Sequence, residues 1–231
     1  MKNNETDLDK YDFPVSRIGN AINPKLIILL ENQASNPDVI TLNPEYVLYL
    51  KNEFKPNINS SQKNNEHMGF DVVIKYDKWW YELSKIWLEC ESKLGLDDVL
   101  SLEYYPYATS ADSDHDKRGI EKQNEIYKYK WDGENKLAKD LLLKNLELLN
   151  AALINKVPIF VYYKSGWYSE SMNVVMYPKL VINDNPYISH YDKKNAVPSG
   201  IKNRLKSFLA SEVVKNRIEE LRNDPVYTLK K

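Results

Sequence analysis

Short groups of polar side chains follow apolar segments at four places along this 231-residue chain. The groups combine carboxylates, amides, hydroxyls and a lysine with tyrosine or tryptophan. Such side chains can orient a water molecule, hydrogen-bond a polar ligand or stack against a ring. In chain order the groups are Glu31, Asn32, Gln33, Ser35 and Asn36; Glu103, Tyr105, Tyr107 and Thr109; Lys164, Ser165 and Trp167; and Asp184, Asn185, Tyr187, Ser189 and His190.

The apolar segments before these groups predict four strands of one sheet. They are short runs rich in Ile, Leu, Val and Tyr, at Lys25–Leu30, Val99–Tyr105, Pro158–Tyr163 and Lys179–Asn183. In a parallel sheet the carboxyl ends of the strands share one edge, and that edge is where α/β proteins bind ligands. The pattern predicts a ligand site there, although polar loops also follow strands that carry no site.

Helical patterns separate most of these strands. Apolar residues recur at three- and four-residue steps over residues 79–95, 134–156 and 199–223, with Asn145 inside the second stripe. Parallel strands need such crossover helices, so the order of elements predicts a parallel, helix-covered sheet. The expected fold is therefore a three-layer α/β/α domain with a four-stranded parallel sheet.

The whole chain, residues 1–231, is expected to form a single domain, since no linker or internal repeat divides it. We expect an N-terminal extension over residues 1–24, an α/β core over 25–210, and a C-terminal helix and tail over 211–231.

The charge balance argues against a global nucleic-acid-binding field, because the formal net charge is −1. Any contact with nucleic acid would need a local basic surface. Glutamates at 212, 219 and 220 interleave with the basic residues of the last helices, which favours an ordinary solvated surface over a phosphate-binding one. These basic residues are Lys202, Arg204, Lys206, Lys215, Arg217 and Arg222.

Several well-defined sites and signals are missing from the sequence. Lys117 and Gln123 occupy the glycine and glutamate positions of a calcium loop that would begin at Asp112. The histidines are scattered and Cys90 is the one cysteine, so neither a zinc set nor an intrachain disulfide is predicted. No P-loop and no GxGxxG motif occurs. The sequence predicts no cofactor, no signal peptide and no membrane span, and it indicates a cytoplasmic protein.

Aromatic residues gather around the ends of the second and third predicted strands. One interpretation is a platform on which a nucleobase stacks. Ordinary packing in a chain with 17 tyrosines is the other. The residues concerned are Tyr104, Tyr105, Tyr107, Tyr162, Tyr163, Trp167 and Tyr168.

Three segments, in this order, give the chain a resemblance to the uracil-DNA glycosylase superfamily, including its poorly characterised bacterial branches. LIILLENQASNP resembles the first motif of that superfamily, LSLEYYPYATS the second and INDNPYISHYDKKN the last. The likeness covers roughly residues 25–210. It implies an active-site loop after the first strand, a base-contacting residue after the second, and a His- or Ser-containing loop after the fourth.

The resemblance also implies roles for individual residues in hydrolysis of an N-glycosidic bond. Asn32 would orient the attacking water, Glu103 would contact the base edge and His190 would stabilise the departing base anion. Ser189 and Asn195 would flank the loop that holds the DNA backbone, with the base flipped out of the duplex. The remaining substrate-binding residues would be Gln33, Asn36, Tyr105, Tyr107, Lys164 and Trp167.

The chain departs from that family at each motif. Gln33 and Ala34 replace a Pro-Gly pair, the acid Glu103 replaces an amide, and Tyr191 and Asp192 replace Pro-Ser. Three hypotheses therefore stay open. The first is an enzyme, either a divergent DNA glycosylase acting in DNA repair or a hydrolase of a related N-glycosidic bond. The second is a non-catalytic module that binds nucleic acid, a nucleotide or a protein on the same fold. The third is an unrelated α/β hydrolase that uses Glu31 or Glu103 as its acid. The sequence gives no indication of the oligomeric state.

Overall fold

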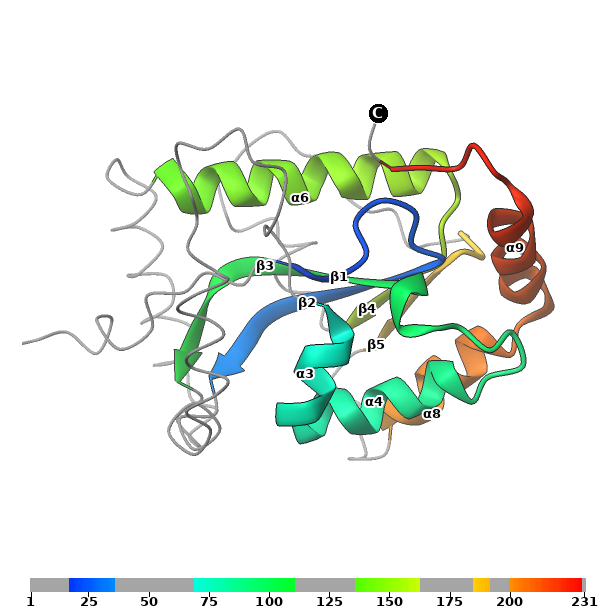
Figure 1. Ribbon diagram of the computed structural model, residues 1–231, viewed down its shortest axis with the longest axis horizontal. Coiled ribbons are helices and arrows are strands. Elements are labelled where there is room, and N and C mark those ends of the chain that lie inside the picture. Colours follow the sequence, from blue (N-terminus) through cyan, green and yellow to red (C-terminus); the bar gives the residue numbers. More distant parts are fainter. Residues whose placement is uncertain (1–16, 36–68, 111–135, 163–184, 192–199, 230–231) are drawn as a thin grey trace, which may run out of the picture.

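A five-stranded mixed sheet lies at the centre of the computed structural model (Figure 1). The structure describes residues 17–35, 69–110, 136–162, 185–191 and 200–229. The strands are β1 (Arg17–Gly19), β2 (Leu26–Ser35), β3 (Val99–Ser110), β4 (Ile159–Tyr162) and β5 (Ile188–Tyr191), in the spatial order β1-β3-β2-β4-β5.

The predicted α/β class is confirmed, and the strand pairing adds an element that was not predicted. Strands β3, β2, β4 and β5 pair in parallel, but β1 pairs with β3 in the antiparallel sense, so the sheet as a whole is mixed. Strand β1 lies within residues 1–24. Three residues are too few to show the alternation by which a strand is recognised in a sequence.

The fourth parallel strand of the described sheet also differs from the prediction. It is Ile188–Tyr191, and the segment 179–183 lies outside the described residues. Ser189 and His190 therefore lie inside β5, and their predicted place in a loop after the fourth strand is wrong. A four-residue strand in which serine and histidine follow one isoleucine carries a weak apolar signal, so the more apolar KLVIN was the stronger candidate.

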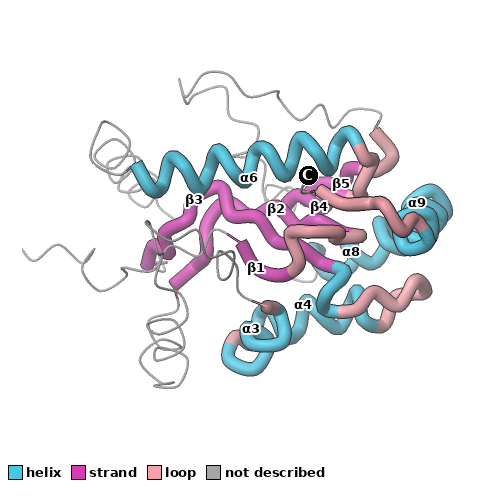
Figure 2. The backbone as a smooth tube through the Cα atoms, turned by 45° about the horizontal axis from the view of Figure 1, so that its top comes forward, coloured by secondary structure: helices cyan, strands magenta, loops and turns pink. Residues whose placement is uncertain are grey.

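Helices cover both faces of the sheet (Figures 1 and 2). Helix α6 (Lys136–Ile154) lies on one face, and α3 (Phe70–Tyr76), α4 (Lys78–Leu88) and α8 (Gly200–Leu209) lie on the other. Helix α9 (Glu212–Asn223) packs at one end of the sheet, and the short 3-10 turn η2 (Leu96–Asp98) leads into β3. The helices expected over 134–156 and 199–223 are thus confirmed, the latter as two.

Strand β2 shows why both faces need covering. Leu26, Ile28 and Leu30 belong to the apolar cluster beneath α4 and α8, whereas Ile27 and Leu29 belong to the cluster beneath α6. Side chains alternate between the faces of a strand, so a continuous apolar run must be buried on both sides.

Helix α4 is rotated about its axis relative to the prediction, so a different set of its side chains is buried. Trp79 was expected on its buried face, but Trp80 is 1% exposed and Trp79 is 37% exposed. Trp80 and Trp87 lie edge-to-face with Phe70 of α3, at ring-centroid distances of 5.0 and 5.4 Å. The Asp77 carboxylate caps the helix by accepting hydrogen bonds from the backbone N–H groups of Trp79 and Trp80. This cap and the Phe70 contacts set the rotation of the helix and direct Trp79 away from the core.

The segment after α9 closes the amino edge of the sheet. The Tyr227 hydroxyl donates a hydrogen bond of 2.6 Å to the Pro24 carbonyl, and the Leu229 backbone N–H donates one of 2.6 Å to the Ile22 carbonyl. The Tyr227 ring is buried and lies 5.2 Å from the Lys25 ammonium. We name residues 224–229 the C-terminal clasp, because they fasten the loop that leads from β1 into β2.

We expect Tyr227→Phe to lower the free energy of unfolding by about 1 kcal/mol at neutral pH, because it deletes a buried hydrogen bond. Burial raises the pKa of the Tyr227 phenol from its ordinary value of 10.0. With the native pKa raised, the phenol contributes stability that is present below about pH 10 and is lost as the pH rises from there through the native pKa. The variant should therefore lose less stability than the wild type in alkaline solution.

Urea unfolding of both proteins at about pH 7 and about pH 11 measures this difference. Tyr81→Phe serves as the control, since the Tyr81 side chain lies on the exposed side of α4. An equal alkaline loss in wild type and Tyr227→Phe would contradict the prediction.

Candidate functional site

The carboxyl edge of the sheet is uneven, because β2 and β3 run on past β4 and β5. Asn32 pairs with Tyr105, Ala34 with Thr109 and Ser35 with Ser110. The first two polar groups of the sequence therefore lie largely within strands, because β2 and β3 run on past their predicted ends at Leu30 and Tyr105. Asn32 and Gln33 belong to β2, and Glu103, Tyr105 and Tyr107 belong to β3.

A bulge explains how β3 continues past Pro106, where the strand was predicted to stop. Between the Asn32–Tyr105 and Ala34–Thr109 pairs the register shifts, so that β3 contributes more residues than β2. Proline lacks an N–H donor and is tolerated in strands at such irregular positions. The ladder resumes beyond it and carries the polar segment farther than the other strands reach.

The register brings the first and second polar groups together. Glu103 pairs with Leu30, and Tyr105 pairs with Asn32, so Asn32 and Glu103 lie two residues apart along neighbouring strands. This is the juxtaposition that the four-group pattern predicts for those two strands.

The same register separates Ser189 from His190. Ser189 pairs with Phe160 and His190 pairs with Val161, and these partners belong to the clusters on opposite faces of the sheet. The Ser189 hydroxyl accepts a hydrogen bond of 3.2 Å from Arg204 Nε of α8. His190 is half-buried on the face that α6 covers. The side chains of Ser189 and His190 therefore lie on opposite faces of the sheet.

Asn32 and His190, the two predicted catalytic residues, do not lie side by side. Leu29 pairs with Val161 and Val161 pairs with His190, so His190 is level with Leu29 and two strands away from β2. Asn32 lies three residues farther along β2, which puts the two Cα atoms about 14 Å apart at standard strand spacings. A ligand that contacts both must extend across the end of β4.

The other predicted site residues fall outside the part of the chain that the structure describes, and their roles stay predictions. They are Asn36, Lys164, Trp167 and Asn195.

An aromatic cluster lies at the carboxyl ends of β4 and β5. The rings of Tyr162 and Tyr191 are stacked, with centroids 5.9 Å apart and an interplanar angle of 2°. The Trp79 ring is tilted against Tyr162 at 5.6 Å. We name Trp79, Tyr162 and Tyr191 the edge aromatics. Their rings come from α4, β4 and β5, which places them beside the ligand-binding edge of a parallel sheet.

The sequence indicated one of these three rings as part of a site. Tyr162 was among the aromatics assigned to the strand ends, but Trp79 was placed on a core face and Tyr191 was noted only as a departure from a motif. The adjacent pair Trp79 and Trp80 did indicate that one of the two rings lies off the buried face of the helix. Consecutive helical residues point about 100° apart, so only one of them can lie at the centre of the buried stripe.

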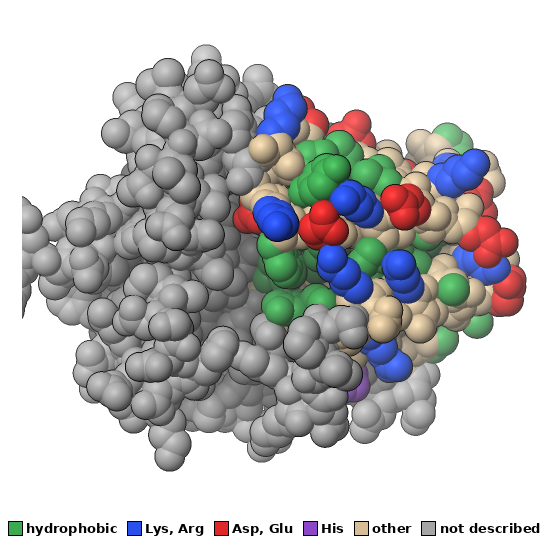
Figure 3. Space-filling view, turned by 90° about the horizontal axis from the view of Figure 1, so that it is seen from below, with side chains coloured by type: hydrophobic (Ala, Val, Ile, Leu, Met, Phe, Trp, Pro, Cys, Tyr) green, Lys and Arg blue, Asp and Glu red, His purple; other side chains and the backbone are tan. Residues whose placement is uncertain are grey.

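Helices α4 and α8, which cover the same face of the sheet, both contribute charged side chains. Lys202 Nζ lies 3.3 Å from a carboxylate oxygen of Glu82 on α4, and both side chains are well exposed. Hydrogen bonds from Lys85 and Lys202 lower the pKa of the Glu82 carboxyl. Arg204 and Lys206 are exposed farther along α8. Figure 3, which views the molecule from this side, shows basic and acidic side chains interleaved.

The basic residues of α9 are engaged in ion pairs. Lys215 pairs with Glu91 and Glu212, Arg217 with Glu220, and Arg222 with Glu219. Arg217 and Arg222 also donate to the carbonyls of Asn155 and Ser92. The glutamates that interleave with these basic residues in the sequence therefore also pair with them in the structure.

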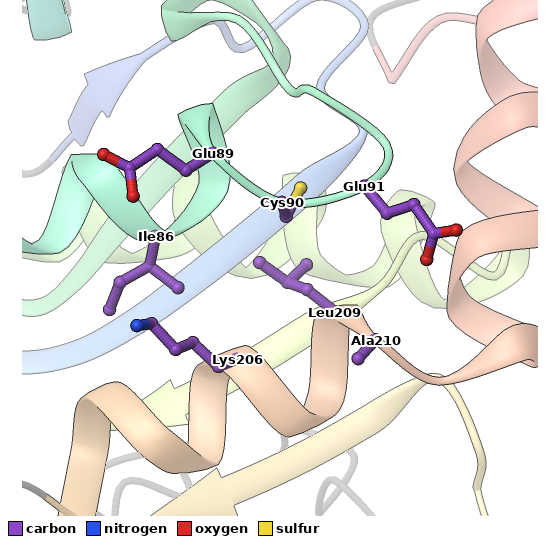
Figure 4. A pocket seen from close by; sticks show the side chains of 7 residues that line it. All are labelled: Ile86, Glu89, Cys90, Glu91, Lys206, Leu209 and Ala210. Carbon is purple, nitrogen blue, oxygen red and sulfur yellow. The ribbon is translucent and has the colours of Figure 1, made fainter.

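A hollow of about 290 Å³ lies elsewhere, between the carboxyl-terminal ends of α4 and α8 (Figure 4). Its lining combines Ile86, Cys90, Leu209 and Ala210 with Glu89, Glu91 and Lys206. The Cys90 thiol donates to the Trp87 carbonyl at 3.0 Å and packs against the core. Among the described residues no three His, Cys, Asp or Glu side chains gather as metal ligands. The carboxyl edge of the sheet is therefore the better candidate site.

Comparisons of the chain with protein-family models, with curated proteins and with solved structures give no significant match. No helix in the described ranges is long and apolar enough to cross a membrane. Function is therefore inferred from the geometry of the carboxyl edge.

Proposed function

We propose that the carboxyl edge of the sheet binds a ligand that contains a nucleobase. The observation that carries this proposal is the cluster of edge aromatics, in which rings from three elements meet beside two polar strand extensions. Stacking of a base on an aromatic side chain is worth about 1–3 kcal/mol, and it tolerates any base because every base has a flat face.

The polar extensions of β2 and β3 complement this stacking surface. A base carries donors and acceptors around its rim, and amide, hydroxyl and carboxylate groups can bind them. The Asn32–Tyr105 pair places an amide residue and a hydroxyl residue opposite each other on neighbouring strands. Stacking would supply most of the affinity, and these polar groups would select the base.

Calorimetric titration with uridine, cytidine, adenosine and guanosine tests the proposal. At least one nucleoside should bind, and Tyr191→Leu should weaken its binding about tenfold by replacing the stacked ring with an apolar side chain. Tyr81→Leu is the matched control, because Tyr81 is an exposed tyrosine of α4 outside the cluster. Equal weakening by both substitutions, or the absence of binding to any nucleoside, would refute the proposal.

A second candidate is hydrolysis of the N-glycosidic bond of an altered base in DNA, as the uracil-DNA glycosylase resemblance implies. The closeness of Asn32 and Glu103 on β2 and β3 favours it, because water positioning and base contact must occur within one site. His190 would reach the departing base only if the substrate extends across the end of β4.

Release of free base from single- and double-stranded oligonucleotides that carry uracil or hypoxanthine tests this second candidate. Release by the wild type that both Asn32→Ala and His190→Ala abolish would support a glycosylase acting in DNA repair. Nucleoside binding without any release would support a non-catalytic binding module. Release that survives both substitutions would assign the chemistry to other residues.

A further inference from the structure

We infer that the hollow between α4 and α8 binds a free α-amino acid with an apolar side chain. This inference goes beyond the proposed function, because the hollow shares no residue with the edge aromatics. Its volume of about 290 Å³ is at the small end of the range of ligand pockets, so it suits a molecule of amino-acid size.

The floor of the hollow is apolar and is fixed by the core. Ile86 is 5% exposed and Leu209 is 0% exposed, and both belong to the apolar cluster beneath α4 and α8. Cys90 packs against the same cluster, and its thiol donates to the Trp87 carbonyl at 3.0 Å. Side chains held in this way need no rearrangement to receive an apolar group, which lowers the cost of binding.

Glu89 and Lys206 place one charge of each sign on the two sides of the hollow. Glu89 follows the last residue of α4, and Lys206 belongs to α8. Both side chains are exposed, and within the described part of the chain neither takes part in an ion pair. Glu91 differs, because Lys215 engages its carboxylate at 2.8 Å. The hollow therefore presents an unpaired carboxylate and an unpaired ammonium together with an apolar floor.

The arrangement of these groups matches that of an amino acid. In Figure 4 the Glu89 carboxylate and the Lys206 ammonium lie on either side of Ile86, and Cys90 and Ala210 lie farther along the hollow. An amino acid likewise carries both charges at one carbon, and its side chain extends away from them. Its carboxylate would bind Lys206 and its ammonium would bind Glu89. The apolar side chain would then cover Cys90 and Ala210.

The ends of the two helices favour a zwitterion over a simple carboxylic acid. Helices α4 and α8 both end at the hollow, and the carboxyl end of a helix carries a partial negative charge. Glu89 adds a full negative charge at such an end. A ligand with only a carboxylate would increase this repulsion, whereas an ammonium group beside Glu89 relieves it. Lys206 in turn disfavours an amine that lacks a carboxylate.

Alkylation of Cys90 by iodoacetamide, followed by mass spectrometry of the full chain, tests the inference. Cys90 is the one cysteine of the sequence and lines the hollow, so the adduct reports directly on occupancy. Leucine should bind with a Kd of about 0.1–1 mM and, at about ten times that Kd, should slow alkylation about tenfold. 4-Methylpentanoate lacks the ammonium and leucinol lacks the carboxylate, so each should bind about tenfold more weakly than leucine.

Two variants separate the contributions of the charges. Lys206→Gln should weaken leucine about tenfold and leave leucinol unchanged, because leucinol has no carboxylate to lose its partner. Glu89→Gln should weaken leucine to a similar extent without weakening 4-methylpentanoate. Lys78→Gln and Glu147→Gln are the matched controls, since they remove the same charges from exposed positions outside the hollow. Both controls should bind leucine like the wild type.

Three results would overturn the inference. The first is an alkylation rate that about 10 mM leucine leaves unchanged. The second is equal protection by leucine, leucinol and 4-methylpentanoate, since the hollow would then recognise only an apolar body. The third is wild-type affinity for leucine in both Lys206→Gln and Glu89→Gln. None of these results affects nucleoside binding at the carboxyl edge, which is measured separately.

Discussion

Asn145→Leu is expected to lower the free energy of unfolding by about 2–4 kcal/mol, because it removes a hydrogen-bond acceptor from a buried guanidinium. Arg17 is 1% exposed and Asn145 is 0% exposed, and Arg17 Nε donates to Asn145 Oδ1 at 2.7 Å. Leucine has a similar volume but no acceptor. The guanidinium would then stay buried without this bond, or β1 would move away from the sheet to hydrate it.

Chemical denaturation of a double-mutant cycle measures the effect. Arg17→Met combined with Asn145→Leu should cost less than the sum of the two single changes, since the double variant leaves no buried charge facing leucine. Asn150→Leu is the matched control, because Asn150 is an exposed asparagine of the same helix, and its effect should stay within about 0.5 kcal/mol. A similar small effect for Asn145→Leu would show that the buried bond is dispensable.

Gly19→Ala is expected to cost about 3 kcal/mol or more, through backbone strain together with a steric clash. Gly19 has a φ angle of +94°, where L-residues are disfavoured. An added Cβ would lie 2.2 Å from the Val99 carbonyl oxygen and 2.7 Å from the Phe70 ring. The carbonyl is fixed in β3 and cannot rotate away. The antiparallel pairing of β1 with β3 should therefore loosen.

Urea unfolding of Gly19→Ala beside Gly95→Ala checks this prediction. Gly95 has a φ angle of −75°, and the nearest atoms to an added Cβ would lie at 3.6 and 4.0 Å. The control substitution should thus be accepted within about 0.5 kcal/mol. Equal costs at the two positions would mean that the contacts around Gly19 relax far more readily than a strand carbonyl should.

The elements with strong periodic patterns were the ones that the sequence predicted correctly. Continuous apolar runs marked β2 and β4, and the long leucine stripe marked α6. Strands β1 and β5 were missed or misplaced, because their pairing depends on partners far along the chain. The continuation of β3 past Pro106 was missed for the same reason, since a bulge is visible only when the opposing strand is known.

The sequence indicated which edge of the sheet carries the candidate site, but it did not indicate most of the residues that meet there. Polar groups at strand ends indicated the carboxyl edge, and the register does bring Asn32 and Glu103 onto neighbouring strands. It does not bring His190 beside Asn32, because His190 is level with Leu29 and lies two strands away from β2. The edge aromatics come from three separate elements, so no local pattern could assemble them. Asn145 in an apolar stripe signalled a buried partner, but Arg17 lies 128 residues away.

The C-terminal clasp is synthesised last, so the order of synthesis affects when the amino end of β2 can be fastened. The loop that feeds β2 is fastened by residues that follow it by more than 200 positions, as in the bond from Tyr227 to Pro24. While the chain is still on the ribosome, β2 can meet β3 and α4, but its amino end stays unfastened until residue 229 has left the exit tunnel. Contacts at such long range close slowly. The nascent chain should therefore pass through a state in which the central strand is paired and its amino end is still open to solvent, and to chaperones.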